Sequence, residues 1–240
     1  YDANAYGPEV TDENLLSRLK TTTANGDLNN DGTYEYIYSY GARSFSIYDE
    51  KGNQVFDSNN DFEKTLAKDY GDFFNGQYDD EDFEWKSAKN RSDDKGAEPE
   101  GLAIGELNSK KFAFVGLERM GGIMVYDITN PSQSKFVQYI STANYGKGNN
   151  EAELKAGVAG DIAPEGLTFV KAEDSPTNYP LLFVAHEVSG TVAVFGLSTD
   201  KITSTQEGVN INQTADFFAY PTNATNTLNL NQVSSGEIFN

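Results

Sequence analysis

The sequence predicts an all-β protein made of β-propeller blades, each a four-stranded antiparallel meander, which together form part of a larger propeller. Residues 98–142 contain four apolar runs of strand length, separated only by short turn sequences. Connections this short force each strand to run antiparallel to the one before it. Four such strands in about 45 residues have the size of one propeller blade.

The four runs are rich in Val, Ile, Phe and Tyr, which favour strands. Each run ends at Gly, Pro, Asn or Ser residues, which favour turns. The predicted strands are Gly101–Leu107, Lys111–Glu118, Gly122–Ile128 and Phe136–Thr142.

Two motifs of this stretch recur in the same order. Pro99-Glu100-Gly101-Leu102 returns as Pro164-Glu165-Gly166-Leu167, and FAFVGLERMGGIMVYDI returns as LLFVAHEVSGTVAVFGL at residues 181–197. A weaker copy, YIYSYGARSFSIYDE, covers residues 36–50. Repeats at unequal spacing indicate one structural unit with insertions, and such units bury their apolar faces against neighbours. An ordinary β-sandwich with chance similarity between hairpins is the alternative.

We therefore predict a partial propeller of about three blades over residues 1–208. The Asn/Thr-rich segment 209–240 is a linker, a strand that closes a blade, or the start of another module. Closed propellers need about four to eight blades. The remainder of the propeller is thus expected from an N-terminal segment, a second chain or a neighbouring copy, packed against terminal-blade residues such as Phe45, Ile47, Val194 and Phe195.

The N-terminal region carries a helix signal and a calcium signal. Thr11 or Asp12 can cap a short helix through Lys20, with Leu15, Leu16 and Leu19 on one side. The following loop, NGDLNNDGTYEY, resembles the start of an EF-hand loop, although Tyr38 stands where the closing Glu is expected. The predicted Ca²⁺ ligands are Asp27, Asn29, Asp31, the Thr33 carbonyl and Glu35. An Asn/Asp/Gly-rich turn without a metal is the alternative.

The insert over residues 57–100 is acidic, with fourteen Asp and Glu against six Lys and Arg. Within it Phe62, Leu66 and Tyr70 recur every four residues, which predicts a short helix over Asp61–Tyr70 that packs on the core. Aromatic residues this dense argue against disorder. Ordered loops of this length are often functional, and a solvated acidic loop held in place by its aromatic residues is the alternative.

Composition excludes several classes of function. A net charge of −19 argues against nucleic acid or an anionic membrane as partner. No apolar run approaches the roughly 20 residues of a membrane span. The chain has no Cys and one His, so zinc, copper and haem sites are disfavoured. That residue, His186, is expected to end a strand with its ring hydrogen-bonded.

Carboxylates are the abundant functional groups. In the predicted meanders Glu100 and Glu165 begin first strands, and Glu118 and Glu187 end second strands, so all four are expected on one face. The insert adds Asp93 and Asp94 to this candidate ligand face or second metal site. Glu side chains that only accept backbone hydrogen bonds are the alternative.

Four stretches carry a resemblance: RSDDKGAEPEG, YSYGARSFSIYD, FVGLERMGGIMVYDITNP and DSPTNYPLLFVAHEVSGT. They are similar to the choice-of-anchor I domain family, which includes relatives of mesenchyme-specific cell surface glycoprotein. The resemblance covers Thr11 to Leu197 and corresponds to the C-terminal half of the family's domain. It implies a secreted or cell-surface β-propeller joined to varied anchoring modules. His186 departs from the Asn that is usual in the family.

The leading hypothesis is a calcium-binding, non-catalytic surface, adhesion or assembly module, with a cell-surface or matrix component as partner. The alternative is a metal-dependent phosphoesterase, since some members of the family carry an alkaline-phosphatase label. In that case the carboxylate face would hold the metal, and Arg43, Arg91, Lys95 or Arg119 would hold phosphate.

Overall fold

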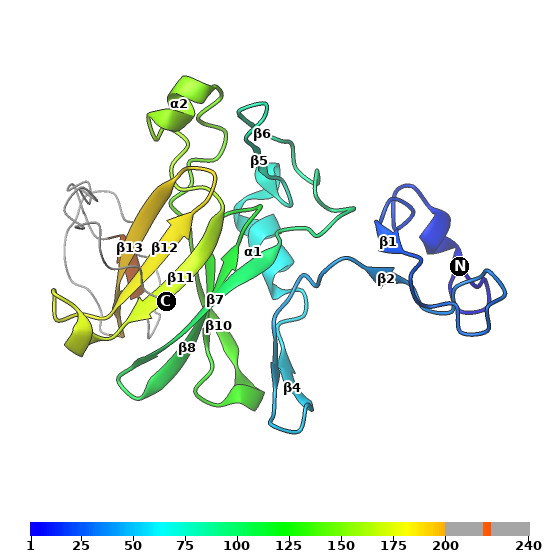
Figure 1. The fold of residues 1–240 in the computed structure, drawn as a ribbon, viewed down its shortest axis with the longest axis horizontal. Helices are drawn as coiled ribbons and strands as arrows, with labels where there is room; N and C mark the ends of the chain where they lie inside the picture. Colours follow the sequence, from blue (N-terminus) through cyan, green and yellow to red (C-terminus); the bar gives the residue numbers. More distant parts are fainter. Residues whose placement is uncertain (200–217, 222–240) are drawn as a thin grey trace, which may run out of the picture.

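The computed structural model describes residues 1–199 and 218–221 (Figure 1). Strands dominate over helices in these residues, and their sheets are antiparallel throughout. The strands are β1 (Thr21–Thr22), β2 (Tyr38–Ser39), β3 (Ser46–Tyr48), β4 (Gln54–Asp57), β5 (Tyr78–Asp79), β6 (Glu84–Trp85), β7 (Pro99–Leu107), β8 (Lys110–Leu117), β9 (Ile123–Asp127), β10 (Lys135–Ile140), β11 (Pro164–Val170), β12 (Leu181–His186), β13 (Thr191–Ser198) and β14 (Phe218–Pro221). The helices are α1 (Asp61–Asp69) and α2 (Glu151–Lys155), with 3₁₀ turns at Pro8–Thr11, Gly71–Phe73, Pro131–Gln133 and Ala172–Asp174.

The meander predicted over residues 98–142 is confirmed as a sheet of four strands in chain order, β7 to β10. A second four-stranded sheet has the order β11-β12-β13-β14. Its last strand comes from the Asn/Thr-rich segment, and the rest of that segment lies outside the described residues.

The two sheets share a backbone feature at the start of their first strands. Glu98 and Ala163 have φ of 59° and 63°, a left-handed conformation that residues with a side chain seldom adopt. The Glu118 N–H donates to the Glu98 carbonyl at 2.9 Å, and the Glu187 N–H donates to the Ala163 carbonyl at 2.8 Å. The turn before the first strand is therefore the same in the two sheets.

A hydrophobic core lies between the two sheets. It combines residues of the first sheet with Leu182, Val184, Phe195 and Leu197 of the second. The Phe114 ring of β8 stacks on the Phe169 ring of β11 with centroids 6.2 Å apart. β7 approaches β11 so closely that a side chain at Gly105 would meet the Phe169 ring at 2.4 Å. A glycine is required there because the two sheets touch at this point.

The other face of the first sheet packs against α1 and the β3–β4 hairpin. The predicted helix is confirmed as α1, and its Phe62 and Leu66 are fully buried. Phe45, which precedes β3, meets the Tyr126 ring edge-on at 4.8 Å. The prediction that Phe45 and Phe195 face a missing partner is thus wrong, since Phe195 lies in the core between the sheets.

The weak copy at residues 36–50 does not form a four-stranded unit within the described residues. β2 pairs with β1, and β3 pairs with β4, in two separate two-stranded sheets. Only the end of the copy, Tyr48-Asp49, repeats the end of β9. The β3–β4 hairpin thus forms a separate two-stranded sheet.

Residues 1–42, the N-terminal lobe, lie apart from the two sheets (Figure 1). The helix predicted from Thr11 or Asp12 to Lys20 is wrong: a 3₁₀ turn at Pro8–Thr11 is followed by turns. The Asp12 side chain accepts the Asn14 N–H at 2.8 Å, a local turn that competes with a helix. Across the described ranges, 1–199 and 218–221, no helix is both long and apolar enough to cross a membrane.

Candidate functional site

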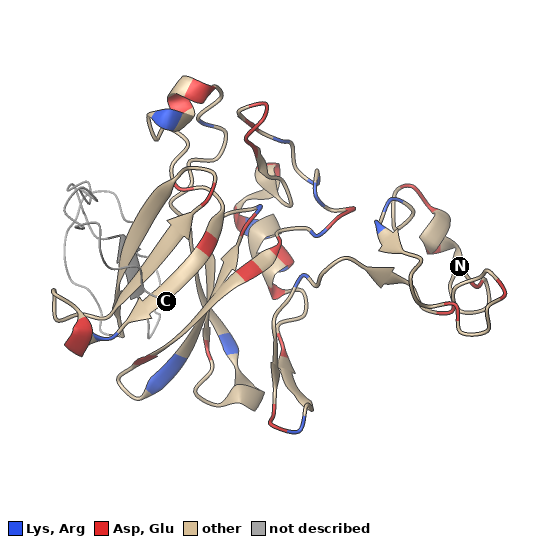
Figure 2. Ribbon diagram, in the orientation of Figure 1, with Lys and Arg blue, Asp and Glu red and all other residues tan. Residues whose placement is uncertain are grey.

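The candidate site lies where the acidic insert enters β7, beside the end of β8. Figure 2 shows acidic residues along the insert and at the ends of β7 and β11 that lie nearest to it. The Glu118 and Arg119 N–H groups donate to the carbonyls of Glu98 and Ala97, so the chain before β7 is held against the chain after β8. This pairing turns the Glu98 side chain inward, and the residue is only 5% exposed.

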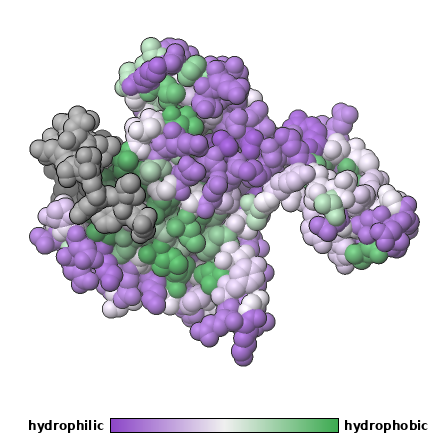
Figure 3. Space-filling view, in the orientation of Figure 1, coloured by the Kyte–Doolittle hydropathy of each residue, from purple (hydrophilic) through white to green (hydrophobic). Residues whose placement is uncertain are grey.

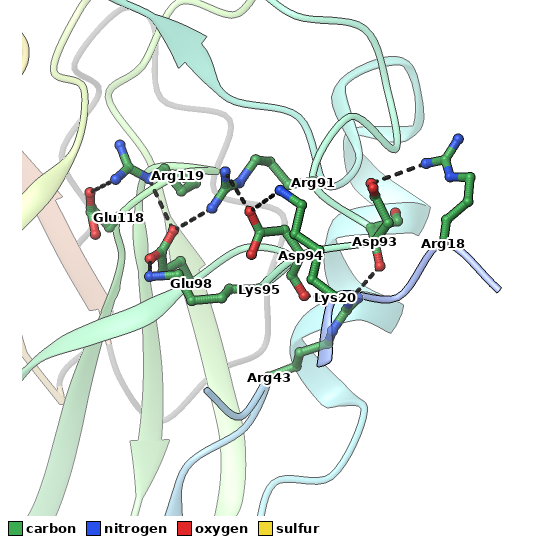
Figure 4. A network of polar contacts seen from close by, with 11 residues as sticks. Arg18, Lys20, Arg43, Arg91, Asp93, Asp94, Lys95, Glu98, Glu118 and Arg119 are labelled. Carbon is green, nitrogen blue, oxygen red and sulfur yellow. Dashed lines mark hydrogen bonds and ion pairs between the residues drawn. The ribbon is translucent and has the colours of Figure 1, made fainter. Parts of the chain in front are cut away.

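Three cations surround the Glu98 carboxylate (Figure 4). Arg91 Nη2 and Arg119 Nε each lie 3.0 Å from Glu98 Oε2, and Lys95 Nζ is paired with Oε1. A buried carboxylate is tolerated only when cations and hydrogen-bond donors satisfy it. Glu98 is therefore the centre of the site.

The network continues to the N-terminal lobe. Arg91 Nη1 lies 3.1 Å from Asp94 Oδ2, which also pairs with Lys20 Nζ at 3.0 Å. Arg18 pairs with Asp93 at 3.0 Å, and the Lys20 N–H donates to the Asp93 carbonyl at 2.8 Å. These contacts form a chain of charges from the lobe through the insert to the first sheet (Figure 4).

Glu98, Glu100 and Glu118 form a carboxylate trio whose oxygens approach within 4.8 Å of one another. Among the described residues it is the one group of three or more acidic or His side chains close enough to share a metal ion. Burial, and after it a hydrogen bond with Glu100, raises the pKa of the Glu118 carboxyl to about 7, while Arg119 acts in the opposite direction. Below that pH, Glu118 keeps a proton that it can donate to Glu100.

The structure brings together only part of the predicted carboxylate face. Glu100 and Glu118 meet, and Asp94 is linked to them through Arg91 and Glu98, whereas Asp93 pairs with Arg18 of the lobe. Glu165 and Glu187 occupy the equivalent positions of the second sheet, where both are exposed and do not belong to the trio. In that sheet Ala163 and Val188 stand where the first sheet has Glu98 and Arg119. The charged side chains that connect the carboxylates of the first sheet are therefore missing around Glu165 and Glu187.

Sequence reasoning missed Glu98, the central residue. Glu98 and Glu100 alternate in AEPEG, but residues two apart share a side only in an extended chain, and Glu98 has a left-handed φ of 59°, so this spacing does not indicate its role. The cations predicted to hold phosphate are all engaged with carboxylates: Arg91, Lys95 and Arg119 as above, and Arg43 with Glu63 at 2.6 Å.

His186 ends β12, as predicted, and is 5% exposed. Its Nδ1 has no hydrogen-bond partner within the described part of the chain, so the prediction of a fully bonded ring is wrong. Burial lowers the pKa of the ring, which keeps it neutral at physiological pH.

The predicted calcium loop connects β1 to β2. The Asp27 carboxylate accepts the N–H groups of Asp31 at 3.2 Å and Gly32 at 3.0 Å. Glu35 closes the loop by accepting the Leu28 N–H at 2.8 Å and the Asn29 amide at 3.1 Å. Gly32 has φ of 86°, as the sharp turn requires.

Oxygen atoms of four predicted ligands thus lie along one short turn, and oxygen is the ligand type that Ca²⁺ requires. The Thr33 hydroxyl donates to Asp31 at 2.6 Å, and hydrogen bonds from Thr33 lower the pKa of that carboxyl. The carboxylate oxygens of Asp27, Asp31 and Glu35 do not all lie within 4.8 Å of one another, as those of the Glu98 trio do. Binding an ion here would require the loop to draw closer together.

Comparison with known proteins extends the sequence resemblance. The family model of the choice-of-anchor I domain matches residues 3–131, which include the lobe, the insert and β7 to β9. Gigasin-3a of Magallana gigas is 30% identical over 190 residues, which cover 78% of this chain and 66% of that protein. The chain thus spans slightly less than two thirds of this relative's length. No solved structure matches. By the extent of the family match, the chain belongs to the choice-of-anchor I domain family.

Proposed function

We propose that the protein is a secreted or cell-surface, calcium-binding module without catalytic activity of its own, which serves adhesion or assembly. Membership of the choice-of-anchor I family supports the location. The observation that carries the non-catalytic assignment is the closed network around Glu98, in which Arg91, Lys95 and Arg119 are already paired with carboxylates. Cations held in this way connect the lobe to the sheet, and the expected partner is a cell-surface or matrix component.

The two four-stranded sheets are, in this proposal, neighbouring blades of a propeller. Their shared left-handed turn and the contact of their first strands, β7 and β11, support this reading. Leu102 and Ile104 of β7 are 55% and 59% exposed, and Figure 3 shows apolar surface over the first sheet beside the β3–β4 hairpin. Further blades, from an N-terminal segment, a second chain or a neighbouring copy, would cover this surface.

A size measurement in solution tests the completion of the propeller. We expect light scattering on the purified 240-residue chain to give a mass above 26.3 kDa, or aggregation that Leu102→Asp/Ile104→Asp reduces. An exposed apolar patch drives such association. A stable monomer that the double substitution does not change would contradict the proposal.

Calcium binding is proposed for the loop from Asp27 to Glu35, with Asp27, Asn29, Asp31, Glu35 and the Thr33 carbonyl as ligands. The support is the turn itself, in which Asp27 already caps two N–H groups and Glu35 closes the far side. An ion that binds only the folded loop stabilises it by about 2.7 kcal/mol when its free concentration is a hundredfold above Kd. The lobe contributes no side chain to the hydrophobic clusters of the described residues, so this contribution would be large for it.

We expect added Ca²⁺ to raise the melting temperature of the chain by about 5–10 °C, since about 1 kcal/mol shifts the transition of a domain of about 150–250 residues by roughly 2–4 °C. Asp31→Ala should abolish the increase. Asp49→Ala is the matched control, because Asp49 accepts N–H groups in a similar turn outside the predicted site. Calorimetry in the presence of Ca²⁺ and of a chelator measures the melting temperature of the unmodified chain and of both variants. A calcium response that survives Asp31→Ala would rule out this site.

A further inference from the structure

The N-terminal lobe contains a hollow of about 480 Å³ on the side of β1 and β2. Twelve residues line it: four are Tyr, four are Ser or Thr, and four are aliphatic. None has a charged side chain, although the chain as a whole contains 55 charged residues, 18 basic and 37 acidic. In such an acidic protein, an uncharged wall of aromatic rings and hydroxyls sets this hollow apart from the rest of the surface.

Two of the tyrosines are fixed by hydrogen bonds of their hydroxyls. The Tyr6 hydroxyl accepts the Ile37 N–H at 2.9 Å, and the Tyr34 hydroxyl donates to the Thr23 carbonyl at 3.3 Å. A third, Tyr36, is 54% exposed, and its N–H donates to the Gly26 carbonyl at 3.1 Å. Hydrogen bonds therefore fix the rings of Tyr6 and Tyr34, whereas the Tyr36 side chain is open to solvent.

This lining determines the chemical class of ligand. An ionic ligand would lose hydration without gaining a counter-charge from any side chain of the wall, which is unfavourable. A purely apolar ligand would leave the Ser and Thr hydroxyls without partners. A sugar ring satisfies both requirements, because its C–H face packs on an aromatic face and its hydroxyls exchange hydrogen bonds with Ser, Thr and Tyr. The volume lies in the range of small-molecule sites, about 300–1,000 Å³.

We infer that this hollow, formed by Tyr6, Tyr34, Tyr36 and the segment 21–23, is a binding site for a neutral saccharide. The inference goes beyond the calcium site and the propeller, and it depends on neither. It also gives a recognition role to the lobe, which contributes no side chain to the hydrophobic clusters of the described residues.

Saturation-transfer NMR on the full chain tests the inference, with maltotriose, cellotriose and N,N′-diacetylchitobiose as neutral probes and glucuronic acid as a charged one. We expect at least one neutral probe to receive saturation at its ring C–H positions and glucuronic acid to receive none. Tyr36→Ala should weaken binding about tenfold, the loss expected for one aromatic contact. Tyr36→Phe should retain binding, because the ring is kept.

Tyr40→Ala is the matched control, since Tyr40 is 51% exposed in the same lobe but does not line the hollow. The Tyr40→Ala variant should bind the neutral probe with the same affinity as the unmodified chain. The inference is overturned if no neutral probe is saturated, if Tyr36→Ala and Tyr40→Ala behave alike, or if the hollow takes up only an apolar dye or peptide. Repeating the titration with a chelator separates this result from the calcium proposal, because saccharide binding should persist when the calcium response is absent.

Discussion

Phe114→Ala is expected to lower the free energy of unfolding by about 3–5 kcal/mol, the range for large aromatic residues removed from a packed core. Phe114 is fully buried in β8, between the two four-stranded sheets. Its ring stacks on Phe169 of β11 at an interplanar angle of 14°. Its removal opens a cavity at the contact that joins the sheets, and both sheets are rigid enough that the cavity cannot close completely.

Phe136→Ala provides the control for residue type. Phe136 of β10 is 38% exposed and touches Tyr126 from outside the core between the sheets, so its loss should cost less than about 1.5 kcal/mol. Urea unfolding followed by circular dichroism measures both variants, with equal slopes required for the comparison. If Phe114→Ala costs no more than Phe136→Ala, the two sheets do not form one core.

The meander could be predicted from sequence because its determinants are local. Each strand from β7 to β10 is an apolar run, and each turn between them is short and marked by its own residues. The predicted strand ends lie within two residues of the observed ones. The repeat in β11 to β13 was visible for the same reason, since it preserves both the strands and the turn of the hairpin.

The absence of the N-terminal helix could not be predicted from the sequence, because helix formation depends on a surface to pack against. Leu15 and Leu16 have helical spacing with Leu19, yet they are 59% and 50% exposed. No hydrophobic cluster in the described residues includes the lobe, so the apolar stripe has nothing to bury itself against. Turns whose hydrogen bonds are local, such as that of Asp12, form instead.

The candidate site was predictable only in part, because its charges come from segments far apart in the sequence. The meander places Glu100 and Glu118 side by side, and that much follows from strand order. The pairing of Arg18 with Asp93, by contrast, joins residues 75 positions apart, and it depends on how the lobe meets the insert. Glu98 became the centre because the left-handed turn before β7 directs its side chain inward, which no residue pattern indicates.

Glu98→Ala is expected to destabilise the protein by about 2–4 kcal/mol, because removing one partner of a buried ion network leaves the other charges uncompensated. The expected loss is below that of a fully buried pair, since the Lys95 and Arg119 side chains are 37% and 34% exposed. The backbone itself should tolerate alanine, because Ala163 adopts the same left-handed φ at the equivalent position of the second sheet. The loss therefore reports on the carboxylate and not on the turn.

Two controls separate the network from its surroundings. Glu165→Ala removes an exposed carboxylate from the equivalent strand of the second sheet, and it should change stability by less than about 0.5 kcal/mol. Glu118→Gln at pH 6 should also have little effect, because below its raised pKa of about 7 this carboxyl is already protonated. Urea unfolding of all three variants at pH 6 decides the matter. If Glu98→Ala loses no more than Glu165→Ala, the three cations are satisfied by water, and the network does not hold the insert and lobe to the sheet.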